Sequence, residues 1–122
     1  MVVILGTSTS GLEESDAYIS ACNSHRAYPH YHYSQQEPGD PSEFFSGLLH
    51  LRGPAYTIST ACSSASWAVI SAPALIEAGV VDVAIAGGSD SLNRMTINGF
   101  HSMGQLLAER SCLFVGIGTV SM

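Results

Sequence analysis

Short apolar runs alternate with stretches of helical character along most of the chain. Residues 2–5 are apolar, residues 80–86 are apolar except for Asp82, and both are rich in Val, which is typical of strands buried on both faces of a parallel sheet. Residues 56–60 form a third predicted strand because they favour β-structure. Helices are predicted over residues 12–22, 42–51 and 62–78, and over part of 92–107. This alternation predicts an α/β fold with a parallel or mixed sheet.

Two of the predicted helices have distinct apolar faces. In residues 62–78 that face consists mostly of small side chains, which suits a central buried helix: Ala65, Ala68, Val69, Ala72, Leu75 and Ile76. In residues 42–51 it consists of large ones: Phe44, Phe45, Leu48, Leu49 and Leu51. Pro73 lies inside the first of these helices, where the loss of a backbone hydrogen bond predicts a kink or a loss of stability.

The composition narrows the class of protein. Of 122 residues, 46% are hydrophobic and only 11% are charged, whereas a typical soluble domain has about 25% charged residues. This excludes a disordered segment or a coiled coil, and it indicates elements that are mostly covered. The net charge of −6 argues against nucleic-acid binding, because the four arginines are scattered and there is no lysine. No apolar run is long enough to span a bilayer, and the first residues do not resemble a signal peptide.

The cysteines point to a reducing environment. Cys22, Cys62 and Cys112 are far apart and odd in number, which fits neither a disulfide framework nor a Cys-x-x-Cys metal site. We therefore expect a cytoplasmic protein without a bound metal. His30 and His32 have no third ligand nearby in the sequence, so a surface loop is favoured over a metal site. Gly87-Gly88-Ser89 lacks the lysine of a phosphate-binding loop, which favours a tight turn.

Cys62 is the candidate for covalent chemistry. It lies between a predicted strand and a predicted helix, where free N–H groups and the helix dipole favour an anion. The thiolate is the nucleophilic form of cysteine, and the same N–H groups can bind the oxyanion of an acyl intermediate. On position alone, a small buried hydrophobic residue remains an equal alternative.

The residues around Cys62 resemble a known active-site segment. Residues 53–65, GPAYTISTACSSA, are similar to the nucleophile segment of the β-ketoacyl-acyl carrier protein synthases. Residues 6–11, GTSTSG, are similar to the family's glycine-rich turn, and residues 75–79 and 82–90 to its next helix and strand. Residues 98–103, NGFHSM, are similar to its following Gly-Phe segment.

The resemblance implies a thiolase-like fold that is incomplete here, with a mixed sheet and a buried nucleophile helix. It implies that Cys62 accepts an acyl chain as a thioester, that its N–H belongs to the oxyanion hole, and that Thr9 and Phe100 lie near the acyl pocket. The implied reaction is decarboxylative Claisen condensation with a malonyl thioester, in fatty acid or polyketide biosynthesis. The implied partners are an acyl carrier protein and a second copy of the chain, with no cofactor.

The chain also departs from the family. The family's second half supplies two histidines and a lysine, but the five histidines here stand in other contexts and there is no lysine. We expect residues 1–110 to be part of the N-terminal domain of such a synthase, inactive in condensation by itself. Residues 111–122 do not resemble the family, although a displaced reading frame can spell its Pro-Phe and Arg-Asp-Gly-Ile-Asn, so a frameshift near Cys112 is our hypothesis. The alternatives are a non-catalytic remnant or interaction piece, and another acyltransferase of the thiolase superfamily.

Overall fold

The computed structural model describes residues 1–106, which form two compact units. The first comprises Met1–Ser91 and the second begins at Leu92. Each is described by itself. None of the helices in residues 1–106 has the length and apolar character that spanning a bilayer requires.

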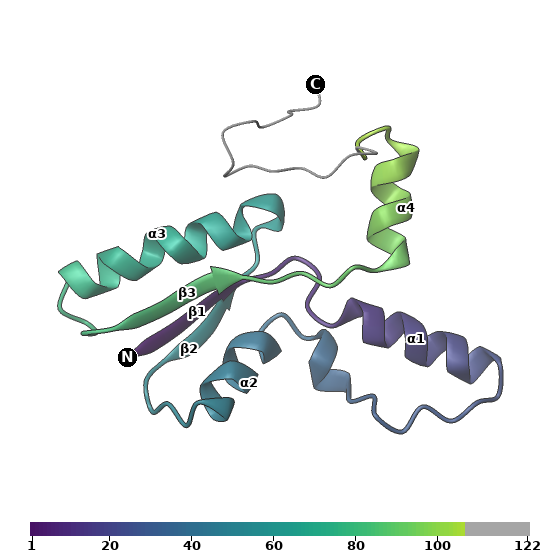
Figure 1. Ribbon diagram of the computed structural model, residues 1–122, viewed down its shortest axis with the longest axis horizontal. Coiled ribbons are helices and arrows are strands. Elements are labelled where there is room, and N and C mark those ends of the chain that lie inside the picture. The colour runs from purple at the N-terminus through teal and green to yellow at the C-terminus, as the bar shows by residue number, and fades with distance from the viewer. Residues whose placement is uncertain (107–122) are drawn as a thin grey trace. The chain divides into compact units, whose positions relative to one another are not determined.

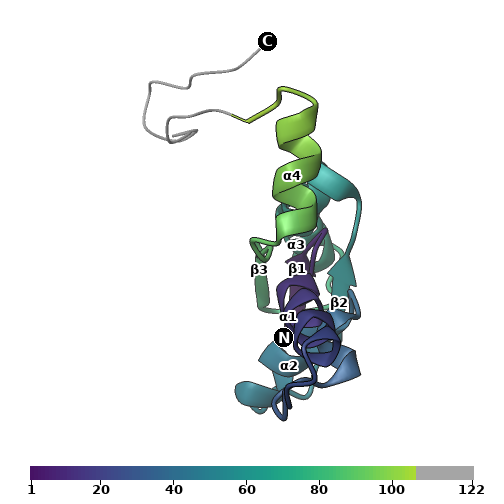
Figure 2. The ribbon, with the colours of Figure 1, turned by 90° about the vertical axis from the view of Figure 1, so that its right-hand side faces the viewer.

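The first unit is built on a three-stranded parallel sheet with the order β2-β1-β3. Its central strand β1 (Val2–Gly6) pairs with β2 (Ala55–Ile58) on one side and with β3 (Ala84–Gly88) on the other. Figure 2 shows β1 between its two partners. The apolar run at residues 2–5 therefore predicted a buried parallel strand correctly, and the described strands form no mixed sheet.

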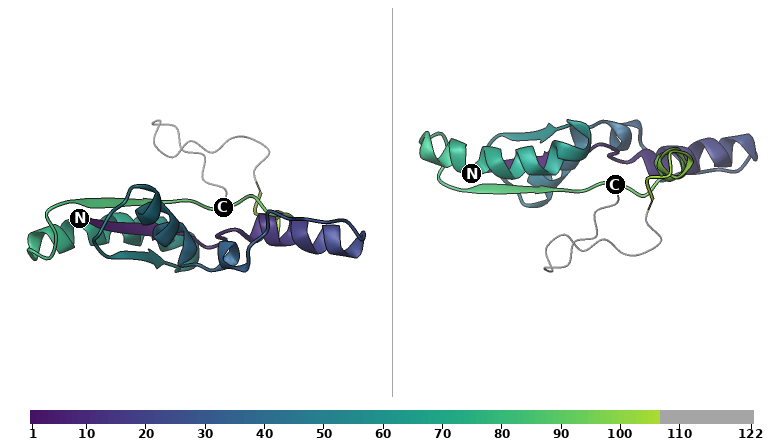
Figure 3. Two further views of the ribbon diagram at one scale, coloured as in Figure 1. Left: turned by 90° about the horizontal axis from the view of Figure 1, so that it is seen from below. Right: turned by 90° about the horizontal axis from the view of Figure 1, so that it is seen from above.

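Helix α3 (Ser64–Glu77) covers one face of this sheet, as Figures 1 and 3 show. Its buried residues are Ser64, Ala68 and Ala72, and the two alanines form a core cluster with Val2 and Ile4. Of the face predicted to be buried, only Ala68 and Ala72 are buried. Ala65, Val69 and Ile76 are exposed, and Leu75 is partly exposed. Large apolar side chains at the surface of α3 include Trp67, Val69, Ile70 and Ile76.

Helix α2 (Asp40–Leu48) contacts β2 and β1 from the opposite face. Its buried residues are Ser42 and Ser46, whereas Phe44 and Leu48 are exposed. The large apolar residues predicted for one side of this helix are therefore not the ones that pack on the sheet within the first unit. The serine face packs instead because Ser42 Oγ donates to the Tyr56 carbonyl at 2.9 Å and lies 2.7 Å from Thr57 Oγ1.

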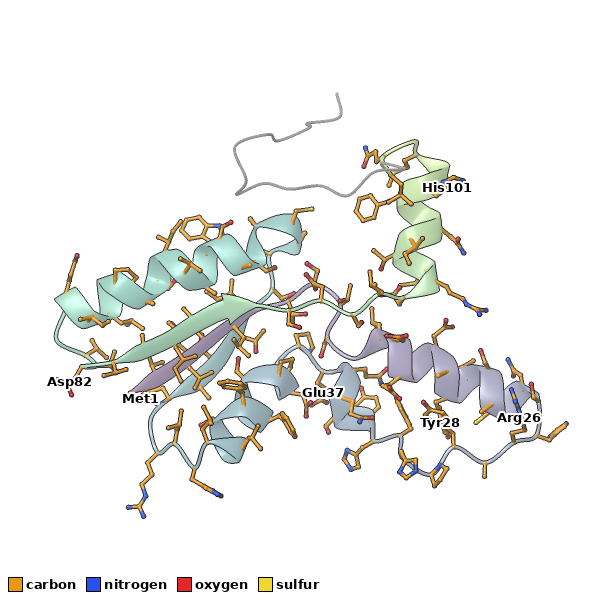
Figure 4. The ribbon with its side chains drawn as sticks, in the orientation of Figure 1. Met1, Arg26, Tyr28, Glu37, Asp82 and His101 are labelled. Atoms are coloured by element: carbon orange, nitrogen blue, oxygen red, sulfur yellow. The ribbon has the colours of Figure 1, made fainter. Side chains whose placement is uncertain are left out.

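Helix α1 (Leu12–Asn23) follows β1 and packs against the 3-10 turn η1 (Tyr33–Gln36). Tyr18 on α1 stacks on Tyr31, with ring centroids 4.3 Å apart. Tyr28, labelled in Figure 4, donates from its hydroxyl to Glu14 at 2.8 Å. These contacts fix the long loop between α1 and α2 to the outer side of α1.

The strand predicted after α3 needs correction. The strand predicted over residues 80–86 begins at Ala84 and includes Gly87 and Gly88, so these glycines form no tight turn. Val81 instead lies in the turn that leads out of α3 and adds to the core cluster.

Helix α3 continues through Pro73 to Glu77 without a break. Because Pro73 lies on an exposed side, water can solvate the carbonyl that the proline leaves without a donor.

The second unit contains helix α4 (Arg94–Ser102). Asn93 caps it, because its Oδ1 accepts hydrogen bonds from Thr96 N at 2.8 Å and Thr96 Oγ1 at 2.9 Å. The helix predicted within residues 92–107 is therefore confirmed. The tail predictions, including Cys112 and the hypothesis of a frameshift, lie outside the described residues.

Candidate functional site

The loops that follow the three strands meet at one edge of the sheet. All strands are parallel, so their carboxyl ends lie together, at the end opposite to Met1 and Asp82 in Figure 4. Backbone bonds join these loops directly: Thr7 N donates to the Ile58 carbonyl at 3.1 Å, and Ser89 N donates to the Gly6 carbonyl at 3.0 Å. In open α/β sheets this edge is where ligands bind.

Cys62 lies at this edge, in the 3-10 turn η2 (Ala61–Ser63) that immediately precedes α3. Its thiol is free and the residue is exposed. The position differs from the predicted one, since the α-helix begins two residues later, at Ser64. Cys62 therefore stands just before the N-terminal end of α3 and open to solvent, rather than inside the helix as a small hydrophobic residue.

The backbone just before Cys62 has an unusual conformation. Ala61 has φ +53°, in the left-handed region that costs residues other than glycine about 1–2 kcal/mol. Its carbonyl oxygen accepts from Ser8 Oγ at 2.8 Å, from Ser64 Oγ and from Ser64 N. Surrounding groups thus hold a strained turn in place, as is common at functional sites.

Serine hydroxyls complete the turn. Ser64 Oγ accepts from Thr60 N at 2.9 Å, and Ser63 Oγ donates to the Thr60 carbonyl at 2.8 Å. These bonds satisfy backbone groups that no regular element pairs between β2 and α3. The polar residues around Cys62 in the sequence therefore have a defined local role, which is to fix its backbone.

Glycines bring α3 close to the sheet at this end. A Cβ atom on Gly6 would overlap the backbone of Ser64 and Ala65, and one on Gly88 would overlap the Cβ of Ala65. Only glycine at the last residues of β1 and β3 allows this approach. The N-terminal end of α3, and with it Cys62, is thereby placed directly over the strand ends.

Asp90 is a part of the site that the sequence did not reveal. It follows β3, and its Oδ1 accepts from Ser8 N, Thr9 N, Thr7 Oγ1 and Thr9 Oγ1 at 2.6, 3.0, 3.1 and 3.0 Å. Partial desolvation alone would raise the pKa of Asp90, but these hydrogen bonds outweigh it and lower the pKa. An acidic residue just after a strand that ends in two glycines is the signal that could have indicated it.

The other candidate residues have mixed outcomes. Thr9 is buried at the same edge, where its hydroxyl donates to Asp90 and accepts from Ser91 N at 2.8 Å. Phe100 lies on α4, in the second unit, and is described only there. His32 caps η1, with its Nδ1 2.9 Å from Ser34 Oγ. Among residues 1–106, no group of three or more His, Cys, Asp or Glu side chains could hold a metal ion.

Comparisons with known proteins agree with this architecture. Nodulation protein E of Rhizobium sp. strain N33 is 36% identical over 90 residues, which cover 72% of this chain and 22% of that protein. The reducing polyketide synthase rdc5 of Metacordyceps chlamydosporia is 37% identical over 86 residues, which cover 68% of this chain and 4% of that protein.

A solved structure is also similar, that of the ketosynthase ApeO in complex with its chain length factor ApeC from Xenorhabdus doucetiae. It has a TM-score of 0.78 and 55% sequence identity, and the match covers 84% of this chain and 26% of that one. The α/β fold is therefore thiolase-like, and the chain spans about a quarter or less of these relatives. The sequence profile described as "Beta-ketoacyl synthase, N-terminal domain" matches residues 1–115, so the chain belongs to the β-ketoacyl synthase family.

Proposed function

We propose that Cys62 is the acyl-accepting nucleophile of this β-ketoacyl synthase chain. The observation that carries the proposal is the exposed thiol at the carboxyl edge of the parallel strands, on a strained turn held by the hydroxyls of Ser8 and Ser64. A thiol just before a helix N-terminus lies near free backbone N–H groups, which can bind the oxyanion of an acyl intermediate. An exposed position also gives a bulky thioester substrate access to the sulfur.

In the proposed first step, Cys62 Sγ attacks the carbonyl carbon of an acyl thioester on a carrier protein. A bond forms from Cys62 Sγ to that carbon, the bond to the carrier's sulfur breaks, and the cysteine proton goes to the leaving thiolate. The N–H of Cys62 is the proposed donor to the oxyanion of the intermediate. Thr9 and Phe100 remain proposed residues of the acyl pocket.

In the proposed second step, a malonyl thioester loses carbon dioxide, and the resulting enolate attacks the carbonyl carbon of the acyl-Cys62 thioester. A carbon–carbon bond forms, Cys62 leaves as the thiolate, and a 3-oxoacyl thioester remains. In the family two histidines assist this step, and no histidine here stands in their sequence contexts. We therefore propose that this chain by itself performs the acyl transfer but not the condensation.

The proposed setting is fatty acid or polyketide chain building in the cytoplasm, where a reducing environment keeps the nucleophile as a free thiol. The proposed partners are an acyl carrier protein and a second ketosynthase-type subunit, in the family's case a second copy. The similar ketosynthase ApeO forms a complex with its chain length factor, which supports a partner of this architecture.

Mass spectrometry after incubation with an acyl thioester tests the acyl transfer. We expect an acyl group on Cys62 and none on Cys22, with loss of the modification in Cys62→Ser and its retention in Cys22→Ser. Equal acylation of all three cysteines, Cys22, Cys62 and Cys112, would contradict a formed site. Supplying malonyl thioester as well should yield no 3-oxoacyl product. Measurable product would overturn the proposal that this chain by itself does not perform the condensation.

A further inference from the structure

Hydrogen bonds through Ser8 join Asp90 to the carbonyl of Ala61, the residue just before Cys62. Asp90 gathers four donors from the loop after β1, namely two hydroxyls and the backbone N–H groups of Ser8 and Thr9. The shortest of these bonds, 2.6 Å, comes from Ser8 N. The carboxylate therefore fixes the backbone of that loop at Ser8.

Ser8 passes this constraint to the turn that carries Cys62. While its N–H donates to Asp90, its Oγ donates to the Ala61 carbonyl at 2.8 Å. Ala61 has a left-handed conformation, so the bond from Ser8 acts on a peptide group whose geometry is unfavourable by itself. Hydrogen bonds to a charged acceptor are about twice as strong as neutral ones, so a carboxylate holds Ser8 better than an amide does.

We propose that Asp90 is a positioning residue for Cys62, acting through Ser8 to hold the strained Ala61–Cys62 turn against the N-terminal end of α3. The proposal rests on the proposed function of Cys62 as nucleophile. Without Asp90, the loop after β1 loses a four-donor acceptor, the Ala61 carbonyl loses a fixed donor, and the thiol is no longer held at the N-terminal end of α3.

The test measures the alkylation rates of Cys62 and Cys22 by iodoacetamide in the same chain, resolved by peptide mass spectrometry. Cys22 is also an exposed free thiol, and it serves as the internal reference. In Asp90→Ala and in Ser8→Ala we expect the Cys62-to-Cys22 rate ratio to fall about fivefold, the equivalent of about 1 kcal/mol. The double variant should fall no further than either single variant, because both act on one chain of contacts.

Conservative variants separate positioning from a general loss of structure. Ser8→Thr retains the hydroxyl and should restore most of the ratio, and Asp90→Asn retains an acceptor without the charge and should be intermediate. Ser42→Ala is the matched control, since it removes a buried hydroxyl with two partners on the other face of the sheet. It should lower the stability and leave the ratio unchanged.

A failure of the positioning role can be distinguished from a failure of the proposed acyl-transfer function. If wild-type Cys62 accepts no acyl group but is alkylated selectively, the acyl-transfer function fails and the positioning role is still decided by the variants. The positioning role is overturned if Asp90→Ala keeps the wild-type ratio, or if Ser42→Ala changes it as much. If Asp90→Ala does not fold, Ser8→Ala and Asp90→Asn decide, and wild-type ratios in both overturn the proposal.

Discussion

The two helices on the faces of the sheet both meet it through small side chains, but they are held by different forces. On the α3 face the contact is apolar and very close, with Ala68 and Ala72 packed on β1 and with glycines at the strand ends. On the α2 face Ser42 is fully buried and is held by hydrogen bonds to β2. Steric fit therefore sets the position of α3, while α2 is positioned by hydrogen bonds.

This difference has a consequence for the site. The α3 contact depends on a close approach of the two backbones and tolerates almost no added volume. A close-packed interior cannot absorb even one methyl group without a shift. A contact made through hydroxyl groups loses one or two bonds when it is altered, but the helix can remain in place. Because Cys62 lies two residues before α3, its position depends on the less tolerant face.

The largest effect is expected from Gly6→Ala. The new methyl group would overlap backbone atoms of Ser64 and Ala65, which cannot rotate away, so α3 must move. We expect a loss of about 3 kcal/mol in the free energy of unfolding, measured by urea denaturation. Gly87→Ala is the matched control, because a Cβ there meets no atom within 4 Å. Similar losses in both variants would remove the steric account of the α3 face.

A smaller effect is expected from Ser42→Ala on the α2 face. Its hydroxyl has two partners, and their loss should lower the free energy of unfolding by about 1–2 kcal/mol. The same measurement on Ser71→Ala, whose hydroxyl bonds only to the Trp67 carbonyl of its own helix, should change by less than about 0.5 kcal/mol. If Ser42→Ala were equally silent, apolar contact alone would hold both helices.

The smallest effect, and the only gain, is expected from Pro73→Ala. Alanine restores the N–H that the proline lacks. The free energy of unfolding should therefore rise by about 1 kcal/mol, without a change in how α3 packs on the sheet. Ser66→Ala, also exposed on α3, controls for helix propensity alone. No gain in the thermal midpoint of Pro73→Ala relative to this control would mean that the helix already accommodates the proline at no cost.

The sequence predicted the order and type of the elements better than their inward faces. Val2 and Ile4 mark a buried strand by themselves, so β1 could be recognised without any knowledge of its neighbours. The serines of α2 could not be recognised as its packed face, because a hydroxyl is buried only when a partner such as Thr57 is present. Gly87 and Gly88 were interpreted as a turn because the segment lacks the lysine of a phosphate-binding loop, whereas both lie in β3 and close packing against α3 requires glycine at Gly88.

The sequence likewise predicted only the part of the site that neighbouring residues define. Cys62 was found from its local position between a strand and a helix, which adjacent residues define. Asp90 was not found, since its partners at Thr7, Ser8 and Thr9 lie more than 80 residues earlier in the chain. Only the parallel arrangement of β1 and β3 brings these residues together.

The close contact of Gly6, Gly88 and Ala65 also limits how the sequence can drift. A methyl group on either glycine would meet α3, and at Gly88 it would meet the side chain of Ala65 itself. A larger residue at any one of these positions is therefore acceptable only if α3 moves away from the sheet. That movement would also displace Cys62, which lies two residues before the helix. The three positions, spread over more than 80 residues of chain, should change together or not at all during evolution.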